Sequence, residues 1–88
     1  MKRNKLEIIR DILKIIQDHH NSIKVTPLIR KSNLSSTRFY EYLKEMQDKK
    51  LIQETINEKG KEIKITEKGQ KYIREFHTII SFIEEFDL

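Results

Sequence analysis

Apolar residues recur every three or four positions in four stretches of the chain, and this spacing predicts four amphipathic helices. The first helix is expected at about 5–19, and its apolar band is so broad that more than one neighbour must cover it. A single extended segment is expected at 22–25. Thr26 as cap and Pro27 as first residue then predict a short second helix that ends near Lys31. The band of the first helix comprises Leu6, Ile8, Ile9, Ile12, Leu13, Ile15 and Ile16.

A third helix is expected at about 36–49, with Ser35 as its N-cap. Phe39, Leu43 and Met46 share one face and are expected in the core. The opposite face carries hydroxyls, a phenol and long charged side chains near the helix N-terminus, which suits a helix in the DNA major groove. A short helix, a brief turn and a longer helix also form a helix-turn-helix pattern, for which an ordinary helical hairpin is the alternative. The candidate DNA contacts are Ser36, Thr37, Arg38, Tyr40, Glu41 and Lys44.

The next stretch alternates polar and apolar residues, which predicts two short strands at 51–56 and 62–65. The turn between them, at 57–61, contains a glycine and two lysines. Such a hairpin with a basic tip is expected to act as a wing, in which Lys59 and Lys61 contact phosphates or the minor groove. Hairpin tips are polar in most proteins and two glutamates dilute the charge here, so the expected contact is a weak one.

Thr66 predicts the cap of a last helix about 20 residues long. A domain of this size needs only the first half of that helix for packing, so residues 78–88 would expose a large apolar patch. Monomeric proteins rarely leave such a patch in water. We therefore expect a homodimer that forms helix against helix, and the alternative is that this segment folds back onto the first helix. The expected interface residues are Ile79, Ile80, Phe82, Ile83 and Phe86.

The 88 residues suffice for one small domain, with a net charge of +4. Residues 1–50 carry 12 Lys and Arg against 6 Asp and Glu, whereas residues 51–88 carry 6 against 8. This asymmetry indicates one surface that faces a polyanion and another that faces away from it. Cysteine is absent, and no residues stand at the spacing of a catalytic or metal-ligating set, so we expect neither an enzyme nor a metal or cofactor. No apolar run is long enough to span a membrane, and we expect a cytoplasmic, nucleoid-associated protein.

Several short motifs together resemble the small archaeal winged helix-turn-helix regulators over about Leu6 to Phe76. These motifs are Asn33-Leu34-Ser35, Tyr42-Leu43, Leu51-Ile52 and Ile65-Thr66-Glu67-Lys68-Gly69. The resemblance implies dimeric DNA-binding transcriptional regulators or chromatin-type proteins, some of which dimerise through a long C-terminal helix. The chain departs from the family at Lys50, where glycine is frequent. Lys50 must therefore take a left-handed conformation at a small cost, or the helix must end differently.

These observations predict a mainly α fold with a small β-hairpin and a long C-terminal helix, arranged as a winged helix-turn-helix. Residues 1–76 are expected to form that domain and residues 77–88 a dimerisation segment. The expected function is transcriptional regulation, or DNA packaging of the chromatin type, by a homodimer that binds double-stranded DNA. The alternative is a winged-helix module that binds proteins and has no DNA-binding role, because a fold alone does not determine function.

Overall fold

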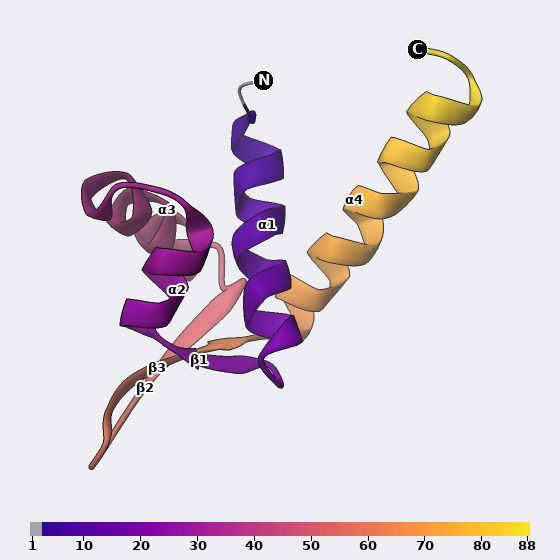
Figure 1. The fold of residues 1–88 in the computed structure, drawn as a ribbon. Coiled ribbons are helices and arrows are strands. Elements are labelled where there is room, and N and C mark those ends of the chain that lie inside the picture. The colour runs from indigo at the N-terminus through magenta and orange to yellow at the C-terminus, as the bar shows by residue number, and fades with distance from the viewer. Residues whose placement is uncertain (1–2) are drawn as a thin grey trace.

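The computed structural model describes residues 3–88, which fold into helices on one side of a small antiparallel sheet (Figure 1). This is the expected mainly α fold with a β-hairpin and a long last helix. Residues 1 and 2 of the predicted domain 1–76 lie outside the described part of the chain. The elements are α1 (Lys5–Asp18), β1 (Ser22–Lys24), α2 (Val25–Ser32), α3 (Ser36–Asp48), β2 (Ile52–Asn57), β3 (Gly60–Ile65) and α4 (Glu67–Glu85).

Within residues 3–88 the sheet has three strands in the order β1-β3-β2, and both pairs are antiparallel. The extended segment expected at 22–25 is therefore a short strand, and Ile23 pairs with Ile63 of β3. The hairpin loop is also tighter than the expected turn at 57–61. Both strands continue toward the tip until Asn57 pairs with Gly60, whose φ of 115° lies in the left-handed region that glycine tolerates.

The start of α2 differs from the sequence prediction. The helix begins at Val25 with Lys24 as N-cap, and no side chain caps it, so Thr26 is not the cap and Pro27 is not the first residue. Pairing in β1 holds the chain extended only to Lys24. Pro27 is tolerated as the third residue because the first N–H groups of a helix have no partner within the helix.

The core lies between the helices and the inner face of the sheet. Phe39, Leu43 and Met46 are buried, as the helical pattern of α3 predicted. Leu6 differs from the rest of its band, because it is 56% exposed at the start of α1. The buried apolar residues are Ile8, Ile9, Ile12, Leu13, Ile16, Ile23, Leu28, Phe39, Leu43, Met46, Leu51, Ile52, Ile63 and Ile65.

The end of α3 is fastened to the start of α4. Lys50 has a φ of 61°, so it takes the left-handed conformation that the absence of glycine made uncertain. The hydroxyl of Thr66 donates to the carbonyl oxygen of Lys50 at 2.7 Å and accepts from the N–H of Gly69 at 3.1 Å. This confirms the predicted cap and couples it to the left-handed turn. A Cβ on Gly69 would overlap the Leu51 carbonyl, so the glycine permits the close approach.

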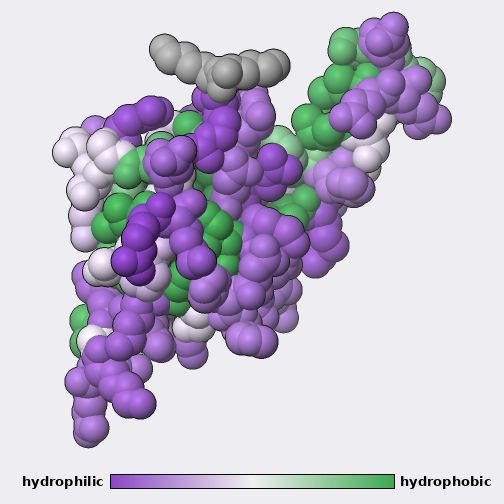
Figure 2. Space-filling view, viewed as in Figure 1, coloured by the Kyte–Doolittle hydropathy of each residue, from purple (hydrophilic) through white to green (hydrophobic). Residues whose placement is uncertain are grey.

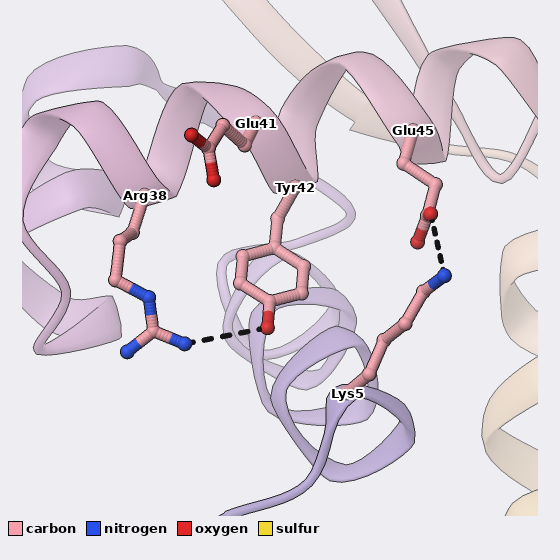
Figure 3. A pocket seen from close by; sticks show the side chains of 5 residues that line it. All are labelled: Lys5, Arg38, Glu41, Tyr42 and Glu45. Carbon is pink, nitrogen blue, oxygen red and sulfur yellow. Dashed lines mark hydrogen bonds and ion pairs between the residues drawn. The ribbon is translucent and has the colours of Figure 1, made fainter.

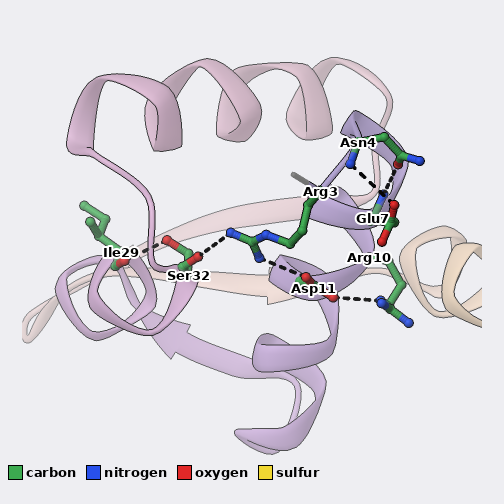
Figure 4. A network of polar contacts seen from close by, with 7 residues as sticks. All are labelled: Arg3, Asn4, Glu7, Arg10, Asp11, Ile29 and Ser32. Carbon is green, nitrogen blue, oxygen red and sulfur yellow. Dashed lines mark hydrogen bonds and ion pairs between the residues drawn. The ribbon is translucent and has the colours of Figure 1, made fainter. Parts of the chain in front are cut away.

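A polar network holds the beginning of α1 against the end of α2 (Figure 4). The guanidinium of Arg3 donates to Asp11 at 2.8 Å and to the carbonyl oxygen of Ser32 at 3.2 Å. Arg10 donates to the same carboxylate at 2.8 Å, and its guanidinium lies 4.8 Å from the ring centre of Phe76 in α4. The network therefore links α1 to the helix that precedes α3 and to α4.

Only the first part of α4 packs against α1. The Tyr72 hydroxyl donates to the Leu6 carbonyl oxygen at 2.9 Å, and burial raises the pKa of this phenol. Further along, α4 diverges from α1 and projects from the body (Figure 1). The alternative in which 78–88 folds back onto the first helix is therefore not what the structure shows.

Candidate nucleic-acid interface

The turn between α2 and α3 directs the start of α3 toward solvent. Asn33 ends α2 in the left-handed conformation with a φ of 60°. The Ser35 hydroxyl then accepts from the N–H of Arg38 at 3.3 Å, which confirms the predicted N-cap. All of the candidate contact residues on α3 are exposed, and together they form one side of the helix: Ser36, Thr37, Arg38, Tyr40, Glu41 and Lys44.

Arg38 stands at the edge of this exposed side, next to a polar hollow of about 220 Å³ between α3 and α1. One of its guanidinium nitrogens lies 3.5 Å from the Tyr42 hydroxyl, and the guanidinium carbon is 5.9 Å from the centre of the tyrosine ring. Figure 3 shows both side chains on one flank of α3, with Lys5 reaching from α1 to Glu45. The phenol orients Arg38 and leaves other N–H groups of the fork available to a ligand.

Glu45 is removed from the exposed face by an ion pair. Its carboxylate lies 2.6 Å from the ammonium of Lys5, and this hydrogen bond lowers the pKa of Glu45. Lys49, at 3.9 Å, adds to that effect, whereas desolvation opposes it. The charge of Glu45 is therefore compensated within the protein. Glu41 is then the one acidic side chain in the first half of α3 that faces solvent.

The hairpin presents the two predicted wing residues in different environments. Lys59 is exposed in the loop, and its backbone N–H donates to the side-chain oxygen of Asn57 at 2.8 Å. Lys61 lies on β3 and forms an ion pair with Glu54 of β2 at 3.6 Å. The structure therefore leaves Lys59 the freer of the two cations.

Two lysines at this surface were not among the residues predicted from the sequence. The ammonium of Lys24 donates to the carbonyl oxygen of Lys59 at 3.1 Å, which brings a third cation to the hairpin tip. Lys5 lines the same polar hollow as Arg38, on the far side of Tyr42 (Figure 3). No local pattern in the sequence indicates either position. The pairing of β1 with β3 places Lys24, and the contact of α1 with α3 places Lys5, and both join distant parts of the chain.

The far part of α4 carries an apolar surface that the described chain does not cover. Ile79, Phe82 and Phe86 are 57%, 54% and 58% exposed, and Ile80 and Ile83 are half-buried. Figure 2 shows hydrophobic residues along this projecting end of the helix. The surface continues toward α1 in an apolar cavity of about 230 Å³ that Leu6, Tyr72, Glu75, Phe76 and Ile79 line.

Residues 3–88 contain no group of three histidine, aspartate or glutamate side chains that could hold a metal ion. In the same part of the chain, no helix combines the length and the apolar character needed to cross a membrane.

The winged helix-turn-helix family matches residues 2–84. The chain belongs to this family. Its helices, its hairpin and the helix after the hairpin account for nearly the whole match. No curated protein matches the sequence.

Solved structures share the fold at low sequence identity. Sso10a-2, a DNA-binding protein from Sulfolobus solfataricus, is 21% identical with a TM-score of 0.78, over 96% of this chain and 85% of that chain. F93 from STIV, a winged-helix DNA-binding protein, is 22% identical with a TM-score of 0.76, over 90% and 91%. AF1382 from Archaeoglobus fulgidus is 19% identical with a TM-score of 0.70, over 92% and 91%. These likenesses establish the fold.

Proposed function

We propose that the protein is a DNA-binding regulator that reads double-stranded DNA as a homodimer. The observation that carries the proposal is the exposed polar side of α3, which begins directly after the helix-turn-helix turn and belongs to the same sheet-and-helix body as the projecting hairpin. In this arrangement α3 would enter the major groove, and the hairpin would reach the adjacent backbone or minor groove.

The first half of α3 supplies groups suited to base edges and phosphates. Arg38 would bond guanine with two N–H groups or hold a phosphate, and its contact with Tyr42 limits its orientations. Glu41 would accept from a cytosine amine or orient a neighbouring cation. Ser36 stands in the first turn, where free N–H groups favour a phosphate, and Lys44 would contact a phosphate further along.

The similar structures support DNA as the partner, since Sso10a-2 and F93 are described as DNA-binding proteins. The charge distribution agrees with them. Basic residues predominate in residues 1–50, which contain α3, whereas the last 14 residues carry four acids and no Lys or Arg. A cytoplasmic, nucleoid-associated protein that regulates transcription would use such an arrangement.

We extend the proposal to the oligomer: residues 77–88 would join two copies through the exposed apolar surface of α4. Ile79, Phe82 and Phe86 leave more than half of their surface in water, which a single chain of this size would rarely do. A two-fold dimer would present two α3 helices to successive turns of the duplex and favour a palindromic site.

The test is a binding selection from random duplexes, followed by titration of the selected duplex with wild type and Lys44→Ala. We expect Lys44→Ala to weaken binding to all duplexes alike and to reduce the slope of log K against log salt by about 1. Lys14→Ala is a matched control, because this lysine is exposed on α1 and pairs with Asp18 at 3.3 Å. If the wild-type protein binds no duplex at low salt, the proposed function is wrong.

One observation favours a second function, a module that binds another protein. Glu41 and Asp48 are exposed on α3 and offset Arg38 and Lys44, so the charge of this helix is not uniformly basic. In that case the selection would recover no duplex, and the same face of α3 would bind a polar protein surface.

A further inference from the structure

Ile56 is a large apolar side chain at a position where it contributes nothing to the core. It is 79% exposed, near the end of β2. Its partner across the hairpin is Lys61, one pair before the Asn57–Gly60 pair that closes the ladder. The projecting hairpin around it is mostly hydrophilic (Figure 2).

The strand alternation places Ile56 on the inner face of the sheet, the face that carries the helices. Side chains of a strand alternate between faces, so Ile56 shares a face with Ile52, which is only 4% exposed. The rise of about 3.3 Å per residue carries Ile56 roughly 13 Å beyond Ile52. Beyond the body the hairpin continues as a projection (Figure 1), so Ile56 lies on the continuation of the face that the helices cover.

Contacts on both sides of the loop hold this part of the hairpin in place. The Asn57 side chain accepts from the N–H of Lys59, and the ammonium of Lys24 donates to the carbonyl oxygen of the same residue. Lys61 and Glu54 form an ion pair on the same face as Ile56. A hairpin that is ordered before binding loses less conformational entropy when it binds.

We infer that Ile56 enters the minor groove of the DNA and makes an apolar contact there, while Lys59 and Lys61 contact the phosphates at its edges. This inference rests on the proposed DNA-binding function. Minor-groove proteins insert apolar side chains, isoleucine among them, between base steps, and lysine side chains contact phosphates. The amino group of guanine projects into this groove, so Ile56 favours A·T pairs at the position it reaches.

The first test compares wild type, Ile56→Ala and Gln53→Ala on the selected duplex over a range of salt concentrations. Gln53 is the matched control because it is exposed on the same strand but lies on the opposite face. Ile56→Ala removes three side-chain carbons. We expect these carbons to be about half buried in the complex, so their loss weakens binding roughly tenfold. It leaves the salt slope unchanged, because the contact is not electrostatic, whereas Lys59→Ala lowers that slope.

The second test changes the base pairs under the wing. Replacing A·T by G·C weakens wild-type binding, and replacing it by inosine·C, which lacks the guanine amino group, restores it. Ile56→Ala loses this discrimination. The inference is overturned if Ile56→Ala binds as tightly as wild type, or if the two proteins differ only in salt slope. In both of those outcomes the wild-type protein still binds DNA, so they are distinct from failure of the proposed function itself.

Discussion

Phe82 allows the proposed dimer to be tested quantitatively. It is 54% exposed and lies with Phe86 on the far part of α4, their ring centres 4.8 Å apart. A phenylalanine buries about 200 Å² when fully covered, so about 100 Å² remains for a partner to cover. At about 25 cal/mol per Å² this area contributes roughly 2.5 kcal/mol, of which alanine would retain a small part.

A two-fold dimer contains this contact twice, so Phe82→Ala is expected to weaken association by about 4 kcal/mol, or roughly a thousandfold in Kd. Sedimentation equilibrium over a wide concentration range measures this constant directly. Ser81→Ala is the control, because Ser81 is exposed beside Phe82 and is not an expected interface residue. A wild-type protein that stays monomeric at every concentration, or a variant with the Kd of wild type, would refute the reasoning.

Two further predictions concern the scaffold. In Gly69→Ala the new Cβ would overlap the Leu51 carbonyl and lie 2.7 Å from Cγ1 of Ile65. We therefore expect the free energy of unfolding to fall by about 2 kcal/mol and the Tm in thermal unfolding to fall by roughly 8–16 °C. An unchanged Tm would contradict this packing. Glu45→Gln tests the ion pair with Lys5. Because the folded state lowers the pKa of Glu45, the stability it contributes is present above its ordinary pKa of 4.5 and is lost as the pH falls through the folded-state value. The Tm difference between wild type and Glu45→Gln should therefore be largest at neutral pH and vanish in acid, and a difference independent of pH would exclude this role.

Local signals account for most of what could be predicted about the fold. The caps at Ser35 and Thr66 were correct because a cap depends on one hydroxyl and the first turn of its own helix. The prediction failed at Thr26, where the same kind of signal competes with strand pairing, and β1 holds the chain extended only to Lys24. The capping box of Asn4 and Glu7 at the start of α1 is also a local signal, but it was not among the predicted caps.

The candidate site also has a part that could be predicted from the sequence and a part that could not. The side of α3 that faces solvent could be predicted, since Phe39, Leu43 and Met46 determine its buried side. The exposure of Ile56 could not be predicted. The strand alternation assigns Ile56 to the inner face together with Ile52, but it does not show that the hairpin extends beyond the helices that cover this face.

The sequence by itself determined the order of the elements, the buried face of α3, the caps of α3 and α4 and the apolar excess of α4, because each depends on residues within a few positions of one another. Only the tertiary structure decided that Lys5 neutralises Glu45, that Lys24 supports the hairpin tip and that α4 diverges from α1 beyond Phe76. These contacts join residues far apart in the chain. Their partners are set by how the helices and the sheet pack, and no local pattern of residues encodes that packing.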